Sequence, residues 1–431
     1  MIACANSHTD LSPGRSSNWP DAWRINMPQS RRTFLKTVIG SPAILSLGGS
    51  VPTFLTCAAG AAESKRRTDR VLVVVQLSGG NDGLNTVVPY ADDIYARKRR
   101  TLRLRRADVL PINEHLGLHP QMEGFSRLLK EGRLGVVQGV GCPVGDRSHP
   151  GAMRNMHTAR PGEPNSPTGW IGRAIDQASG LDGVSANGVF VGPINAPPAM
   201  NPGRSTAVSI RSANQLTLRK PNRISKSGAE GNPLLAHVRA ASNAACAADR
   251  IVRAVLADAG SDLGYPRRGL GPQLKTIAEL IEADIGVRIF MTELGGGGIG
   301  GFDNHAIQRD NHAALLANLS QSLAAFASDL ARRKQLDRTA LMTFSEFGRT
   351  LTENGRKGTG HGNAAPMFIV GGKVRSGLIG KHPALDDLDN DAPKHHTDFR
   401  RVYATMLSSW LGLDSKSVLG PEFKPMDLLT V

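Results

Sequence analysis

The chain has 431 residues, a formal net charge of +15 and only four cysteines. So few cysteines exclude a fold built on a disulfide framework. Aromatic residues are scarce around the densest basic run, residues 96–106, which argues against a surface that stacks on nucleic-acid bases. Without an N-terminal leader, about 370 residues remain, which fits one large α/β domain with insertions.

The first segment, residues 1–62, has the features of an export signal. Ser30-Arg31-Arg32-Thr33-Phe34-Leu35-Lys36 is a twin-arginine motif, a mildly apolar stretch follows, and small residues near Ala61 offer a cleavage site. We therefore predict export by the twin-arginine translocase, with residues 63–431 as the mature domain outside the cytoplasm. An uncleaved membrane anchor is the alternative, but the stretch contains glycine and proline and is short for a span.

Predicted strands and helices alternate through the first half of the mature chain. Residues 70–77 are a continuous apolar run that ends in two glycines, the pattern of a strand buried on both faces. The sequence then predicts a helix, a strand, a loop and a second helix, in that order, over 122–131, 134–140, 161–166 and 168–177. Residues 193–233 are rich in Pro, Asn, Ser, Arg and Gly, which favours an insertion or lid.

The same alternation continues through the second half. Helices are predicted over 233–259 and 273–283, a strand over 285–293 and a long amphipathic helix over 315–330. Two further strands and a last helix are predicted over 339–344, 366–370 and 398–411. Strands that alternate with helices predict an α/β fold, with a mostly parallel sheet and helices on both faces.

Polar side chains follow the ends of the predicted strands. They are Asp82, the Arg147-Ser148-His149 loop, Asp303 with His305, and Glu346, while His361 stands just before the next strand. Since the carboxyl ends of parallel strands share one edge of the sheet, we expect these side chains to converge. Carboxylates and imidazoles bind divalent ions such as Zn²⁺, Mg²⁺ or Mn²⁺. A serine beside such an ion can lose its proton and act as a nucleophile.

Each of these residues also has an ordinary structural role open to it. Asp82 stands in an Asn-Asp-Gly turn sequence, Ser148 is a favoured helix N-cap, and Glu346 could simply pair with Arg349. Asp303 could cap the following helix and His361 could line a glycine-rich loop. The residues also leave open whether Ser148 or His149 is the reactive member of its pair.

Two further interpretations concern partners and cofactors. The basic run 96–106 is best explained as a solvated surface that faces phosphate groups or the cell envelope, and no nucleic-acid partner is expected. The turn Gly79–Gly83 lacks the G-x-G-x-x-G spacing of a dinucleotide site, which disfavours an NAD-dependent enzyme. Cys142 and Cys246 remain in the mature chain and could pair, which the sequence does not decide.

Several motifs in combination resemble one family. The motifs are VVQLSGGNDGLNTVVPY, DRSHPGAM, GFDNH, TFSEFGRT, GTGHGNAAPMFIVGG and DFRRVYATMLSSWLG. Together with the leader they look like the exported domain-of-unknown-function 1501 family, which is grouped with the alkaline phosphatase-like superfamily. The resemblance covers nearly the whole mature chain. It implies an alkaline phosphatase-like α/β sheet and a site for two divalent metal ions.

The resemblance also assigns roles. Asp82 and Glu346 would hold one metal with Ser148 as the bridging nucleophile, and a second metal would bind Asp303, His305 and His361. Arg349 or Arg147 would bind the anionic oxygens of the substrate. The chain departs from the family's pattern at Gly360, where an Asp is common before the histidine.

The predicted function is therefore hydrolysis of a phosphate or sulfate ester, on an anionic small molecule or polysaccharide. The alternative is an exported binding or scaffold protein with a degenerate site of the same fold.

Overall fold

The computed structural model describes residues 70–181, 188–193, 195–205, 207–212, 253, 263–284, 286–295 and 301–430. The export signal, nearly all of the predicted helix 233–259 and Cys246 lie outside these residues. Export and a Cys142–Cys246 disulfide therefore stay predictions. No described helix is both long enough and apolar enough to cross a membrane.

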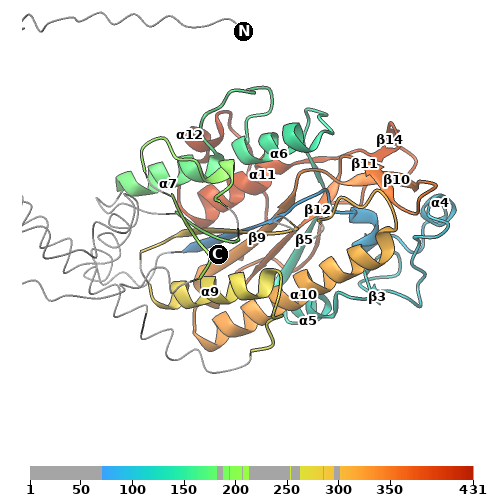
Figure 1. Cartoon of the computed structure of the whole chain (residues 1–431), viewed down its shortest axis with the longest axis horizontal. Helices are drawn as coiled ribbons and strands as arrows, with labels where there is room; N and C mark the ends of the chain where they lie inside the picture. The colour runs from blue at the N-terminus through green and yellow to red at the C-terminus, as the bar shows by residue number, and fades with distance from the viewer. Residues whose placement is uncertain are drawn as a thin grey trace, which may run out of the picture. The chain divides into compact units, whose positions relative to one another are not determined.

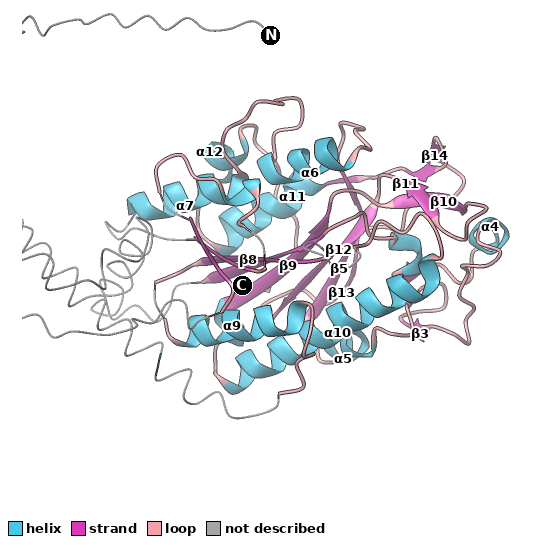
Figure 2. Cartoon of the chain, in the orientation of Figure 1, coloured by secondary structure: helices cyan, strands magenta, loops and turns pink. Residues whose placement is uncertain are grey.

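A nine-stranded mixed sheet forms the centre of the described part (Figures 1 and 2). Its strand order is β13-β5-β12-β9-β1-β8-β6-β7, and β16 pairs with β5 at the end of that strand. The strands are β1 (Val71–Leu77), β5 (Leu134–Gly141), β6 (Gly188–Val191), β7 (Ala207–Ile210), β8 (Ile289–Leu294), β9 (Thr339–Ser345), β12 (Ala365–Gly371), β13 (Gly377–Ile379) and β16 (Thr397–Asp398). Only β12 runs antiparallel to its neighbours in this sheet. The predicted mostly parallel α/β sheet is confirmed.

Helices cover both faces of the sheet (Figure 1). One face carries α5 (Glu123–Lys130), α9 (Leu270–Glu282) and α10 (Gln308–Arg332), and the other carries α6 (His149–Thr158), α7 (Trp170–Leu181), α11 (Phe399–Ala404) and α12 (Ser415–Leu419). Successive residues of β1 alternate between the faces, because side chains in a strand point to opposite sides. Val71 and Val73 join the core under α5, α9 and α10, whereas Leu72 and Val74 join the core under α6, α7 and α11.

Smaller elements gather beyond one edge of the sheet. They are α4 (Asp93–Lys98), the strands β2 (Val87–Val88), β3 (Leu110–Pro111), β4 (Gly117–Leu118), β10 (Arg349–Glu353), β11 (Thr359–His361), β14 (Leu388–Asp389) and β15 (Ala392–Pro393), and the 3-10 turn η2 (Gly83–Asn85). Two other 3-10 turns, η3 (Pro198–Met200) and η5 (Leu336–Arg338), lie elsewhere in the chain. None of these elements was predicted from the sequence, since segments of two to six residues carry too little periodicity.

The structure corrects three of the predicted elements. Part of the predicted insertion, Ala207–Ile210, is the edge strand β7, which pairs in parallel with β6. Residues 213–233 of that segment lie outside the described residues. The strand predicted from residue 285 begins only at Ile289, because Asp284 and Gly286 have positive φ angles and form a turn after α9. The predicted last helix changes after α11 into a π-helix over Thr405–Trp410 (η6).

The antiparallel strand β12 is what brings late residues to the site. Parallel strands β1, β5, β8 and β9 all end at one edge of the sheet, whereas β12 begins there because its direction is reversed. Residues that precede β12, including His361, therefore meet residues that follow the other strands.

Candidate metal centre

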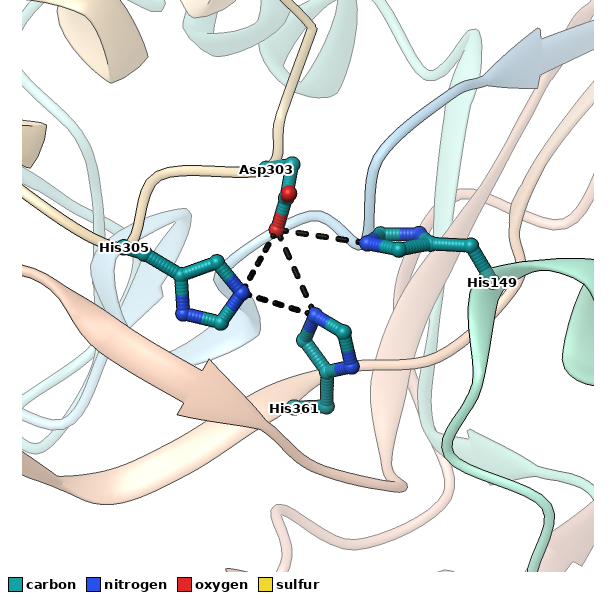
Figure 3. Close-up of side chains that lie close together, drawn as sticks. All are labelled: His149, Asp303, His305 and His361. Atoms are coloured by element: carbon teal, nitrogen blue, oxygen red, sulfur yellow. Dashed lines mark hydrogen bonds and ion pairs between the residues drawn. The ribbon is translucent and has the colours of Figure 1, made fainter.

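Three histidines and one aspartate converge at this edge of the sheet (Figure 3). One ligand atom from each of His149, Asp303, His305 and His361 lies within 4.8 Å of the others. Three imidazole nitrogens face the same carboxylate oxygen, Oδ1 of Asp303: Nε2 of His305 at 3.0 Å, Nε2 of His149 at 3.3 Å and Nε2 of His361 at 3.4 Å. This is the one group of its kind among the described residues.

The four side chains come from three places in the fold. His149 is the first residue of α6, which follows β5. Asp303 and His305 lie in the loop that leads from β8 to α10, and His361 ends β11 just before β12. Their convergence confirms that the strand ends share one edge, and it joins residues that are up to 212 positions apart.

Glu346 orients His149. Its carboxylate is buried, accepts a hydrogen bond from the backbone N–H of Gly79 at 2.7 Å, and lies 3.1 Å from Nδ1 of His149. The hydrogen bond to Glu346 raises the pKa of His149 above its ordinary value. If His149 is neutral, Nδ1 carries the proton and Nε2 is a bare acceptor.

The other ring nitrogen of His149, Nε2, has no hydrogen-bond partner among the described residues. Nε2 of His149 is buried and makes no hydrogen bond among the described residues, although Oδ1 of Asp303 is 3.3 Å away. Two acceptor atoms that face each other at this distance repel, so the geometry requires a cation between them: a second proton on the imidazole or a metal ion. The residues present therefore fit a divalent ion.

His361 is oriented by the backbone. Its Nδ1 lies 2.6 Å from the carbonyl oxygen of Arg147, which can only accept a hydrogen bond. Nδ1 therefore carries a proton, and in the neutral ring Nε2 would present its lone pair to Asp303 and to Nε2 of His305, 2.8 Å away. A backbone carbonyl in this position is a common partner of metal-binding histidines. Burial lowers the pKa of His305, which favours the neutral imidazole that a metal needs.

Arg349 fixes Asp303. Its guanidinium is fully buried and donates to the carboxylate at 2.7 Å, to the carbonyl oxygens of Gly80 and Phe302 at 2.8 and 3.0 Å, and to that of Gly79. Burial disfavours the charged form of Asp303, but the hydrogen bond and charge of Arg349 prevail, so the pKa of Asp303 lies below its ordinary value. These bonds engage the donors of Arg349 and hold the Asp303 carboxylate in place. Substrate binding by Arg349 or Arg147 stays a prediction.

Tight packing of the glycine turn holds the same loop. Gly79 and Gly80 have φ angles of 113° and 80°, which glycine adopts without strain. A Cβ on Gly79 would lie 2.5 Å from the backbone nitrogen of Asp303, and one on Gly80 would overlap the ring of Phe347. That ring stacks on His361 with centroids 4.6 Å apart. The turn therefore sets the position of Asp303 and of the Phe347 ring that packs against His361.

Asp82 has a different partner from the one predicted. Its buried carboxylate binds the guanidinium of Arg99 through both oxygens, at 2.6 and 3.1 Å, and accepts a hydrogen bond from Gln308. Burial opposes ionisation, yet the charge of Arg99 lowers the pKa of Asp82 to about 2. Asp82 is thus not among the four converging groups but forms a buried ion pair, and Glu346 contacts His149. The metal-binding role that the resemblance assigns to Asp82 and Glu346 stays a prediction.

Ser148 also stands apart from the group. Its exposed hydroxyl donates to Asp146 at 2.7 Å and caps α6 by accepting from the N–H of Gly151 at 3.2 Å. The guanidinium of Arg147 is bound to Asp389 at 2.6 Å. Of the pair that the sequence left open, His149 faces the centre and Ser148 serves as the N-cap. Sequence reasoning missed the buried partner Arg99 and the carbonyl of Arg147, which no motif marks.

The fold and the site together define an α/β protein with a His₃Asp group at the carboxyl ends of its sheet strands. The chain belongs to the family of proteins of unknown function DUF1501, whose model matches residues 141–426, more than half of the chain. The predicted family is thereby confirmed.

Solved structures resemble the chain only distantly. A sulfatase from Pseudoalteromonas, PsFucS1, shares 10% identity over 87% of this chain and 74% of its own, with a TM-score of 0.40. The lipoteichoic acid synthase LtaP from Listeria monocytogenes shares 10% over 75% and 72%, with a TM-score of 0.34. An alkaline phosphatase superfamily protein from Vibrio parahaemolyticus shares 11% over 77% and 71%, with a TM-score of 0.31. Similarity this distant identifies no reaction. A search of the curated proteins found no match.

Proposed function

We propose that the protein is an exported, metal-dependent hydrolase of phosphate or sulfate esters, with its reacting centre at His149, Asp303, His305 and His361. The convergence of three Nε2 atoms on one carboxylate oxygen, at 3.0–3.4 Å, carries this proposal. These four residues would hold a divalent ion, which would supply Lewis-acid chemistry: polarisation of an ester oxygen and a lower pKa for a bound water. This form of the hydrolase uses water as the nucleophile in place of Ser148, whose hydroxyl is engaged with Asp146.

The donor set favours zinc over the other ions that the sequence allowed. Three imidazole nitrogens and one carboxylate oxygen are ligands that Zn²⁺ accepts in a four-coordinate site, whereas Mg²⁺ prefers oxygen ligands and retains water. Glu346 and the carbonyl of Arg147 supply the outer hydrogen bonds that fix the imidazoles. The group forms one site, which supports one ion rather than the two predicted.

Charge and access support an anionic substrate. The carboxylates of Asp303 and Glu346 contribute −2, Arg349 contributes +1 and a divalent ion +2, so the loaded centre has a formal charge of +1. Asp303 and His305 have 43% and 38% of their side chains exposed. An ester group can therefore reach the centre from solvent, and the net positive charge of the loaded centre would attract a sulfate or phosphate.

The test is turnover by the zinc-loaded protein on a panel of aryl phosphates, phosphodiesters and aryl sulfates. We expect hydrolysis of at least one class, at least about 100-fold lower in His305→Ala, because a ligand is lost. His115→Ala removes an exposed histidine outside the centre and serves as the matched control, with unchanged turnover. A wild-type protein that holds zinc at these residues yet hydrolyses none of the classes would overturn the hydrolase.

One observation favours a second function, a non-catalytic binding protein. Arg349 already neutralises Asp303, and Nε2 of His305 lies at hydrogen-bond distance from Nε2 of His361, so protons alone complete the cluster. In that case the cluster is only structural, and the replacement of His361 does not change the affinity of the protein for divalent ions.

A further inference from the structure

A basic surface lies beside the metal centre. It consists of eight exposed cationic side chains, from α4 and the chain that follows it, from the start of α10 and from the turn between β10 and β11. They are Arg97, Lys98, Arg100, Arg103, Arg106, Arg309, Arg356 and Lys357. α4, β10 and β11 lie at the same end of the described part in Figure 1.

Specific hydrogen bonds hold these three segments side by side. The buried Arg99 donates from Nε to the carbonyl of Leu351 at 2.6 Å and from Nη2 to that of Thr350 at 2.8 Å, which anchors the basic run on β10. Arg309 donates to the carbonyl oxygen of Thr101, which joins the start of α10 to the same run. The basic run is therefore a fixed part of the fold.

The turn between β10 and β11 connects this surface to the centre. The carbonyls of Arg356 and Lys357 accept hydrogen bonds from the backbone of Ile307 and Gln308, both at 2.9 Å. The side chain of Asn354 donates to the carbonyl of the ligand His305 at 2.9 Å. Two cations of the basic surface thus stand on a turn that packs against the half-exposed His305.

The cations of this surface have few acidic neighbours. The ion pairs of the basic run in the described part are the buried Arg99–Asp82 pair and the exposed Arg105–Asp108 pair. The carboxylate of Glu353 accepts hydrogen bonds from the backbone of Thr101 and Leu102 at 2.8–3.0 Å instead of binding a cation. Asp93, Asp310 and Glu353 offset three of the eight charges, which leaves a formal excess of +5.

We propose that the basic surface binds a linear polysaccharide that carries sulfate or phosphate groups, and that the chain runs from this surface into the metal centre. The proposal rests on the proposed function and narrows its substrate to a polymer. Arginine predominates, and its planar fork binds such anions through two parallel hydrogen bonds. Nucleic acid fits less well, because the tyrosines beside the run are engaged: Tyr95 is buried, and the Tyr90 ring lies near Arg106.

The experiment measures binding by the full chain after its metal is removed with a chelator, so that turnover plays no part. The probes are dextran sulfate fractions of increasing length, inorganic sulfate, and poly(dT) of matched charge. We compare wild type with Arg100→Gln/Arg103→Gln, with Arg356→Gln/Lys357→Gln, and with Arg267→Gln/Arg268→Gln. The last pair is exposed just before α9, a helix that lies away from α4 in Figure 1, and its substitution removes the same charge.

We expect the Kd to fall at least about ten-fold from the shortest to the longest dextran sulfate. The first two variants should weaken binding of the longest fraction about ten-fold and lower the slope of log Kd against log salt by about two, one for each cation removed. The Arg267→Gln/Arg268→Gln variant should bind as wild type does.

Equal weakening in all three variants, or no dependence on length, would overturn the inference, because either result indicates diffuse attraction to net charge. Tighter binding of poly(dT) than of dextran sulfate would also overturn it, in favour of a nucleic-acid surface. If the zinc-loaded protein binds the polymer but does not hydrolyse esters, the proposed hydrolase function is overturned, whereas the proposed polysaccharide-binding surface is supported.

Discussion

Two aspartate–arginine pairs lie at the same edge of the sheet and differ in what surrounds them. In the Asp82–Arg99 pair both side chains are buried, with 2% and 0% exposed, and all neighbours are structural. In the Asp303–Arg349 pair the arginine is equally buried, but 43% of the aspartate is exposed and three histidines face it. The first pair joins the basic run to the sheet, whereas the second presents a carboxylate to solvent.

A position at the end of a strand therefore does not decide whether an aspartate has a structural or a chemical role. Both aspartates follow a strand and a glycine-rich stretch of sequence, and both have a lowered pKa. What separates them is the neighbours that the fold supplies. Removing Asp82 should cost stability, and removing the groups around Asp303 should cost metal binding.

The largest expected effect is on stability. Asp82→Ala leaves the Arg99 charge buried and unpaired, so we expect a loss of about 3–5 kcal/mol in the free energy of unfolding, measured in urea. Asp303→Ala should lose less than about 2 kcal/mol, because Asp303 is 43% exposed, so water can take the place of its carboxylate beside Arg349. Equal losses of unfolding free energy in the two variants would contradict this distinction between the two pairs.

The next effect concerns zinc. His361→Ala removes one of four ligands, so its zinc affinity should fall more than 100-fold, beyond the roughly 10- to 100-fold cost of losing an outer partner. Competition with a zinc chelator measures this affinity, and His115→Ala is the control with the same substitution outside the centre. Wild-type affinity in His361→Ala would mean that the ion is held elsewhere.

The stability that the Asp82–Arg99 pair contributes should depend on pH. The pKa of Asp82 is lowered from 3.8 to about 2 in the folded protein, so its contribution to stability is present above pH 4 and lost as the pH falls toward 2. This difference corresponds to about 2 kcal/mol. The stability difference between wild type and Asp82→Asn should therefore shrink by that amount between pH 5 and pH 2. A constant difference across this range would contradict the ion pair.

The smallest expected effect distinguishes a residue that hydrogen-bonds to a metal-binding histidine from a residue that binds the metal directly. Glu346→Gln keeps an acceptor for Nδ1 of His149 and for the Gly79 N–H but removes the charge. We expect zinc affinity to fall about 10-fold, with stability changed by less than about 1 kcal/mol. A loss as large as that of His361→Ala would identify Glu346 as a direct ligand.

Much of the fold could be predicted from the sequence, because long apolar runs and helical spacing are local signals. Strands β1, β5 and β9 and helix α5 lie close to their predicted ranges, whereas α10 begins seven residues before its predicted start. The strand β7 was missed because four residues with alternating burial carry a weak signal inside a polar segment. The π-helix after α11 was missed because its backbone depends on tertiary packing that no local pattern records.

The site was predictable only in part, for a physical reason. Strand ends placed Asp303, His305, Glu346 and His361 at one edge, and the structure brings them there. The choice of partner for Asp82 depends on Arg99, which arrives from α4 through tertiary contacts. The antiparallel direction of β12, which delivers His361, likewise could not be derived from its apolar run.

The most direct test of the central claim is anomalous X-ray diffraction at the zinc edge from crystals of the zinc-loaded protein. We predict one strong anomalous peak, bounded by Nε2 of His149, His305 and His361 and by Oδ1 of Asp303. A peak beside Asp82, or no peak at this group of four residues, would contradict the account.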